Sequence, residues 1–287
     1  MDVLATLANL SLLVFVICSM MAMGLSLTIP EIMEPLKNKS LVIKSLLASF
    51  VLVPILGYLL TLVLPVSEGS GTGIIIVACA AGAPFLPKLV QMAKGNLAFG
   101  VGLMTLLMVL TVIYMPVVLP LLLQGVTVDA LAIASSLFFQ MLVPLGVGLL
   151  IRARYAEAAA HIQPTFSMAS NLGLISLMVL GLILGFSSFV GAFGSWAIFA
   201  AAVFIIGAFA IGYILGGPGQ DKRAVVSLGT AQRNLAAAMI VAAGNFTDPD
   251  VLTEVLIIAL IGLALLLVAS GELGKRVQGS AVAGKAN

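Results

Sequence analysis

Residues 81–88 read AGAPFLPK, and residues 227–234 read SLGTAQRN. In the first segment Pro84 and Pro87 follow Gly82 and stand three residues apart. Proline has no backbone donor and clashes with the preceding helical turn, so an unbroken helix is not expected there. The second segment places a run of polar residues around Gly229 in an otherwise apolar stretch. Both segments therefore predict helices that are interrupted in the middle.

The sequence around these segments is that of a membrane protein. Of its 287 residues 62% are hydrophobic and only 8% are charged, and the mean hydropathy is +1.25. An average soluble domain is about a quarter charged, so a soluble fold of this length could not cover its surface. The composition excludes soluble enzymes and disordered chains, and the net charge of +2 is too small to indicate nucleic acid as a partner. The expected partner of the surface is the lipid bilayer.

Nine stretches are long and apolar enough to cross a bilayer, which takes about 20 residues each. They are 6–28, 41–65, 72–94, 97–124, 128–151, 165–188, 193–216, 223–245 and 250–271. These stretches are continuously apolar and do not alternate with polar residues, so we expect helices and not the strands of a β-barrel. The predicted fold class is an all-α polytopic membrane protein with about nine transmembrane helices.

The basic residues occupy alternate linkers. They follow the first, third, fifth, seventh and ninth spans: Lys37, Lys39, Lys44, Lys94, Arg152, Arg154, Lys222, Arg223, Lys275, Arg276 and Lys285. The N-terminus and the other linkers carry acids: Asp2, Glu68, Asp129, Asp248, Asp250 and Glu254. Lys and Arg collect on the cytoplasmic side of membrane proteins. We therefore expect an integral protein of the bacterial inner membrane with its N-terminus outside and its C-terminus in the cytoplasm.

Two basic residues remain inside predicted spans. Arg233 lies about 15 Å into the eighth span and Lys88 about 9 Å from the cytoplasmic end of the third, at 1.5 Å per residue. The acids all fall in linkers, tails or span ends, so neither cation has an obvious carboxylate partner. A central charge costs at least about 2.5 kcal/mol to insert, which favours a functional reason for keeping it. We interpret both as part of an anion site.

Two alternatives to the anion site stay open. Lys88 could extend its side chain to the cytoplasmic interface, and Arg233 could donate hydrogen bonds to backbone carbonyls of the broken helix. In the sixth span, Ser167, Ser170 and Asn171 are interpreted as interhelical hydrogen bonds, with the lining of a cavity as the alternative.

The two interrupted segments lie five spans apart, so they are oppositely oriented in the membrane. Non-helical backbone at membrane depth needs protein or a water-filled cavity to satisfy it, and pairs of broken helices form transporter sites between inverted repeats. We expect a first repeat over 1–124 that lacks one of five helices, a second repeat over 125–271, and a cytoplasmic tail over 272–287. The residues expected to bind the substrate are Arg233, Lys88, Gln232, Asn234 and Thr230.

Three stretches resemble the bile acid:sodium symporter family, and the resemblance covers nearly the whole chain. They are MGLSLTIPEI at 23–32, VACAAGAPFLPKLVQMAKGN at 77–96 and SLGTAQRNLAAA at 227–238. The resemblance implies two inverted five-helix repeats, arranged as a panel and a core domain, with two broken helices crossing in the core. Some members lack the first helix, in agreement with nine spans. It also implies secondary transport of small organic anions, usually with sodium, by alternating access.

The positions that hold sodium in this family carry other residues here. A gap-free alignment places Leu86, Pro87, Gly100, Met104, Ser227 and Ala231 at these positions. Five of the six have no side-chain oxygen, which is what sodium needs from its ligands. We therefore expect no conventional sodium site, no other metal and no cofactor, and we expect Lys88 and Arg233 to replace the charges of the two sodium ions.

Two other functions stay open. Related arsenite efflux permeases also use a cysteine in the first broken helix, where Cys79 lies, although they usually have ten spans and an acid in the second broken helix. A sensor or scaffold that transports nothing could also have lost its coupling ligands. An enzyme is not expected, because the chain has one His and no catalytic pair or metal cluster can be assembled inside the membrane.

Overall fold

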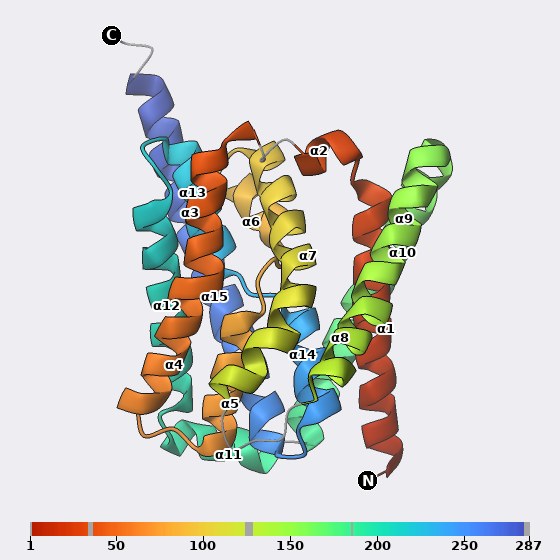
Figure 1. Ribbon diagram of the computed structural model, residues 1–287, viewed down its shortest axis with the longest axis vertical. Helices are drawn as coiled ribbons and strands as arrows, with labels where there is room; N and C mark the ends of the chain where they lie inside the picture. Colours follow the sequence, from red (N-terminus) through yellow and green to blue (C-terminus); the bar gives the residue numbers. More distant parts are fainter. Residues whose placement is uncertain (1, 34–36, 124–128, 185, 284–287) are drawn as a thin grey trace.

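A computed structural model describes residues 2–33, 37–123, 129–184 and 186–283 (Figure 1). Every regular element in these ranges is a helix. The α-helices are α1 (Asp2–Ser26), α2 (Ile29–Met33), α3 (Lys39–Leu47), α4 (Val53–Val63), α5 (Glu68–Cys79), α6 (Leu86–Met92), α7 (Leu97–Leu122), α8 (Ala130–Leu137), α9 (Val143–Arg154), α10 (Ala156–Leu184), α11 (Phe186–Gly194), α12 (Ala197–Leu215), α13 (Gln220–Ala231), α14 (Leu235–Asn245) and α15 (Pro249–Ala283). Two π-helical segments, η2 (Ala48–Leu52) and η3 (Phe138–Leu142), join α3 to α4 and α8 to α9.

The all-α membrane fold is confirmed. Eight of the described helical segments are long and apolar enough to cross a membrane. The remaining predicted span, the third at 72–94, corresponds to the pair α5 and α6, whose halves of 12 and 7 residues are each too short to cross alone. The sixth predicted span begins earlier than expected, at Ala156, because its polar AEAAAH start has high helix propensity.

The helices form two groups, as the resemblance implies. We call α1, α8, α9 and α10 the panel; α1 packs along both α9 and α10, on the right in Figure 1. We call the remaining long helices the core, in which α15 packs along α5 and α12, and α12 along α13. The predicted repeats stay a prediction, and their boundary at 124–125 lies outside the described residues. The chain from 272 to 283 continues α15 without a break.

The charged residues gather at opposite ends of the helices. α3 and α13 begin, and α6, α9 and α15 end, at the upper end in Figure 1, which we call the basic end. It carries all the basic residues predicted for the cytoplasmic linkers except Lys285, which lies outside the described residues. We call the opposite end the acidic end, defined by Glu68, Asp129, Asp248, Asp250 and Glu254.

Candidate functional site

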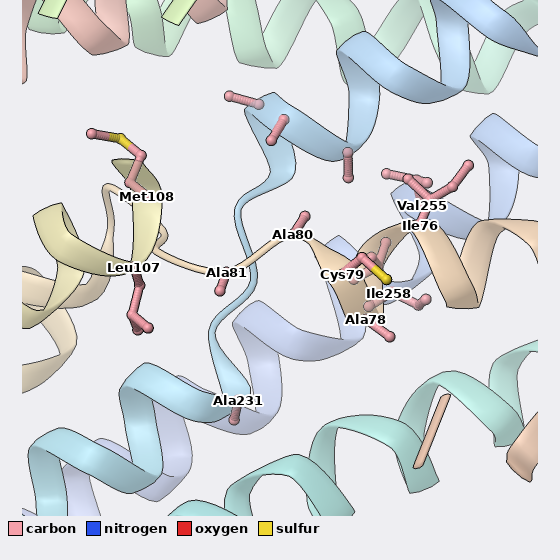
Figure 2. Close-up of a cluster of buried hydrophobic side chains, with 14 of the residues drawn as sticks. Ile76, Ala78, Cys79, Ala80, Ala81, Leu107, Met108, Ala231, Val255 and Ile258 are labelled. Atoms are coloured by element: carbon pink, nitrogen blue, oxygen red, sulfur yellow. The ribbon is translucent and has the colours of Figure 1, made fainter. Parts of the chain in front are cut away.

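The two broken helices cross in the core (Figure 2). α5 ends at Cys79 and α13 at Ala231, and the extended segment at Ala80 and Ala81 passes the extended segment that follows Ala231. The segments are joined directly, because the backbone N–H of Asn234 donates to the Ala80 carbonyl at 2.8 Å. The Asn234 side chain adds a second bond, from Nδ2 to the Gly82 carbonyl at 3.1 Å. The predicted crossing of two interrupted helices is therefore confirmed.

The first interruption is stabilised by three features of the sequence. Gly82 has a φ of +78°, and an ideal Cβ on it would lie 2.6 Å from the Met108 Cα of α7. The Thr111 hydroxyl bonds both the N–H and the carbonyl of Ala81 at 3.0 Å, which replaces helical bonds lost at the break. Pro87 lies in the first turn of α6, where its missing N–H leaves no bond unmade.

The second interruption depends on Asn234. Its Oδ1 accepts a hydrogen bond from the Ala237 N–H at 3.1 Å and so caps the N-terminus of α14. Gly229 is not in the break: it lies in the last turn of α13, and an ideal Cβ on it would lie 3.1 Å from Leu86 Cδ2. The glycine therefore allows α6 to approach α13 closely.

Arg233 lies inside the crossing and is only 3% exposed. Its Nε donates to the Val77 carbonyl at 3.2 Å, its Nη1 to the Thr230 carbonyl at 3.1 Å, and its Nη2 to the carbonyls of Ala78 at 2.5 Å and Ser49 at 3.3 Å. Three of these carbonyls belong to the C-terminal ends of α5 and α13, where the helix dipole leaves negative partial charge. The bonds to backbone carbonyls considered from the sequence are therefore present; anion binding by Arg233 stays a prediction.

The fourth carbonyl that accepts from Arg233, that of Ser49, is available because a proline follows it in the helix. Pro54 has no N–H to offer to the preceding turn of η2 and α4. Because this N–H is missing, the backbone carbonyls of Ser49 and Phe50 lack a hydrogen-bond donor from the helix itself. Arg233 donates to the first, and the Tyr114 hydroxyl of α7 donates to the second at 2.6 Å. The crossing is thus joined through Arg233 to a third helix of the core.

A cavity of about 600 Å³ lies between the panel and the core. The panel contributes residues of α1 and α10, and the core contributes residues of α6, α7, α14 and α15. Most of its wall is apolar, with a smaller set of polar and charged side chains: Ser19, Ser26, Glu31, Lys88, Gln91, Gln163, Ser167, Ser170, Asn171, Gln232 and Arg233. The cavity extends from the crossing toward the basic end, where α2, the helix of Glu31, and the start of α10, the helix of Gln163, are found.

The structure brings three of the five predicted binding residues together. Lys88, Gln232 and Arg233 are on the wall of the cavity, whereas Thr230 and Asn234 are buried at the crossing and are not part of the wall. Lys88 is exposed, and no ion pair links it to a carboxylate in the described ranges. The carboxylate on the same wall, Glu31, accepts bonds from the N–H and hydroxyl of Thr28. The cavity therefore has an uncommitted positive charge.

Several wall residues were not predicted as binding residues from the sequence. One face of α10 lines the cavity with four polar residues, Gln163, Ser167, Ser170 and Asn171. Their three- and four-residue spacing is a helical stripe that could have indicated them. Ser170 also donates to the Phe15 carbonyl of α1 at 3.2 Å, so the expected interhelical bond and the cavity lining both occur.

The residues at the positions aligned with the family's sodium ligands are mostly without side-chain oxygen. Leu86, Met104 and Ala231 are buried side chains without oxygen. The Ser227 hydroxyl donates to the Ala224 carbonyl within its own helix at 3.1 Å. Across the part of the chain that the structure describes, no group of three or more His, Cys, Asp or Glu is placed to hold a metal ion. Cys79 is buried at the end of α5 and is not part of the cavity wall.

The chain is similar in sequence to known membrane transporters. The profile described as the Sodium Bile acid symporter family matches residues 12–192, more than half of the chain. A probable sodium/metabolite cotransporter of rice chloroplasts, BASS2 of Oryza sativa subsp. japonica, is 30% identical over 238 residues, which are 80% of this chain and 56% of that protein. The BASS6 counterpart of Arabidopsis thaliana is 25% identical over 270 residues, 88% of this chain and 66% of that protein.

A bacterial relative is also similar. An uncharacterized sodium-dependent transporter of Bacillus subtilis, YocS, is 27% identical over 170 residues, 56% of this chain and 52% of that protein. The chain thus spans about half to two thirds of the length of these relatives.

Proposed function

This chain belongs to the Sodium Bile acid symporter family, and from that membership we propose that it is a secondary transporter of a small organic anion that works by alternating access. The observation that carries the proposal is the cavity of about 600 Å³ between panel and core, with Lys88 on its wall and the crossing at its inner end. Movement of the core past the panel would expose this cavity to one side of the membrane and then to the other.

The chemistry of the cavity favours an anion with an apolar body. Lys88 offers an ammonium group, and Gln232 offers an amide on the wall of the same cavity. The rest of the wall is mainly apolar, with Met23, Met104 and Leu174 among its residues. In this proposal Lys88 and Gln232 contact the anionic group. Arg233, buried in the crossing, adds positive charge to that end of the cavity. Thr230 and Asn234 stabilise the crossing.

We further propose that transport does not use the conventional sodium sites. The guanidinium of Arg233 sits against the C-terminal carbonyls of α5 and α13, where negative partial charge needs a cation. A resident arginine supplies that cation permanently. The names of the relatives include sodium, so this chain would differ from them in its coupling.

The proposal is tested by the melting temperature of the purified protein in a set of carboxylates from acetate to cholate, each as sodium and as choline salt. We expect at least one anion to stabilise the protein equally in both salts. Lys88→Gln should weaken that anion's binding about 10- to 100-fold, the loss of one charge-assisted hydrogen bond. Lys44→Gln, which removes an exposed lysine of α3 outside the cavity, should bind as the unaltered protein does.

Three results would contradict this proposal. If no anion binds, the protein is a sensor or scaffold and not a transporter of this class. If stabilisation needs sodium, the sodium-free coupling is wrong. If Lys88→Gln and Lys44→Gln behave alike, Lys88 does not contact the anion.

A further inference from the structure

Glu254 is a carboxylate inside the membrane-spanning part of the protein. From the sequence Glu254 is expected in an outer linker with Asp248 and Asp250, but it lies in α15, one turn beyond Asp250, and its exposed fraction is 0%. The sequence could not show this, because α15 begins at Pro249, directly after the short acidic linker. Glu254 is not on the wall of the cavity between the panel and the core, nor does it bond to the crossing.

The surroundings of Glu254 leave its charge uncompensated. The side chain packs on Gly73 of α5, where an ideal Cβ would lie 2.7 Å from Glu254 Cβ. Neither Oε1 nor Oε2 has a hydrogen-bond partner, although both are buried. The Ser70 hydroxyl of α5 faces the carboxylate without completing a hydrogen bond to it.

The other charged groups near Glu254 are also acids. Asp250 acts on it from its own helix, Glu68 begins α5, and Asp248 lies against Gly69 of α5. The neighbouring helices α11, α12 and α14 contain no charged residue at all in their described sequences. Lys, Arg and His are absent from the described residues of the acidic end. Among the described residues, no counter-ion at this end can therefore balance an ionised Glu254.

A second cavity, of about 220 Å³, lies beside this carboxylate at the acidic end. Five of its eight wall residues have polar side chains: Ser67, Ser70, Ser195, Asp250 and Thr253. It has room for several waters, each of which takes about 30 Å³ in the liquid. Ser70 borders both the cavity and Glu254, and the Ser67 hydroxyl donates to Asp250 Oδ2 at 3.2 Å. Water from the acidic side can thus come within one side chain of Glu254.

From this geometry we infer that Glu254 is a proton-binding site, filled from the acidic side through the second cavity. Ionised carboxylates buried without donors or cations cost several kcal/mol, whereas the neutral acid costs much less. A proton carried by water forms an O–H bond on one carboxylate oxygen, and its release to water restores the carboxylate. Sodium would need several more oxygens than the carboxylate and Ser70 provide, so the proton is the better occupant.

This inference rests on the proposed function in one respect: it makes the proton the coupling ion of the sodium-free transporter. The anion cavity and Glu254 lie on different parts of α15, since Ala259 and Leu263 border the cavity and Glu254 faces α5. Protonation of Glu254 removes a charge from the contact between α5 and α15. The state of this contact would then depend on the proton supply at the acidic end.

Infrared spectroscopy of the purified protein tests the site without any transported anion. We expect the C=O stretching band of a protonated carboxylic acid at neutral pH, shifted in D₂O and lost at alkaline pH. Glu254→Gln keeps the shape of the neutral acid and should lose the band. Glu272→Gln, which removes an exposed carboxylate at the other end of α15, should retain it.

Three outcomes would overturn the site: no such band at neutral pH, a band that survives in Glu254→Gln, or a band that sodium chloride removes while choline chloride does not. The last would mean that sodium, and not the proton, occupies the carboxylate. If Glu254→Gln fails to fold, the band and its titration in the unaltered protein decide the question. Since no anion is present, a protein that binds no anion could still show the band, so the failures of the two proposals are distinguishable.

Discussion

At the scale of single residues, Arg233 shows how a charge becomes part of the membrane interior. Its guanidinium donates to four carbonyls that come from α5, η2 and the end of α13. These carbonyls are free to accept because α5 and α13 end at the crossing and because Pro54 has no N–H to donate within η2 and α4. A planar group with five donors can satisfy them together, whereas a lysine ammonium has three donors at one point.

Arg233→Gln should therefore destabilise the protein by at least about 3 kcal/mol, because each buried carbonyl left without its donor costs about 1–3 kcal/mol. Arg233→Lys should restore only part of the loss. The melting temperature in detergent measures both. As a control, Lys88→Gln should change stability by less than about 0.5 kcal/mol, because Lys88 is exposed. A melting temperature of Arg233→Gln equal to that of the unaltered protein would show that these bonds are dispensable.

At the scale of elements, the position of the interruption between α5 and α6 could be predicted from the sequence, but its backbone conformation could not. Pro84 and Pro87 prevent a continuous helix wherever they stand, which is a local effect of the ring. The conformation of Gly82 has a different cause, the approach of the Met108 backbone of α7, which no local pattern reveals. The chain between α5 and α6 therefore contacts α7 at Gly82.

Gly82→Ala should strongly reduce the yield of folded protein, because the new methyl group would meet the α7 backbone and the residue would keep a φ of +78°. Size-exclusion chromatography of the detergent-solubilised protein reports the folded fraction. The matched control is Gly146→Ala in α9, where nothing lies within 4 Å of the new methyl group. That change should be neutral or slightly stabilising, and equal behaviour of the two variants would refute the close contact at Gly82.

At the scale of the whole molecule, charge separates the two ends of the helices. All described basic residues of the predicted cytoplasmic linkers lie at one end, and the charged residues described at the opposite end are all acids. This asymmetry predicts the basic end in the cytoplasm and the acidic end outside. The anion cavity would then extend toward the cytoplasm, and the second cavity would take its protons from outside.

A cysteine-accessibility experiment measures this orientation. Glu68→Cys at the acidic end and Lys39→Cys at the basic end are both at exposed positions. With Cys18 replaced by Ala and Cys79 buried, a membrane-impermeant maleimide should label Glu68→Cys in intact cells. Lys39→Cys should react only after the membrane is opened. The reverse pattern would invert the topology and the direction from which Glu254 is filled.

The membrane spans could be predicted from the sequence, whereas the cavity could not, and the difference has a physical reason. Insertion into a bilayer depends on the composition of one stretch and the charges that flank it, so the spans, their alternation and the two interruptions followed from local sequence. The polar stripe of α10 was visible too, but its cavity was not, because a cavity needs two surfaces and α10 supplies one.

The roles of the ionisable residues were decided only by the tertiary structure. Arg233 and Val77 are 156 residues apart, and their bond forms because two helices end at the same place. Glu254 became a buried acid because Gly73 of another helix leaves room for it and offers no donor. Whether a charge is bonded, free or neutral depends on its neighbours in space, and contacts between distant segments exist only after the helices have packed.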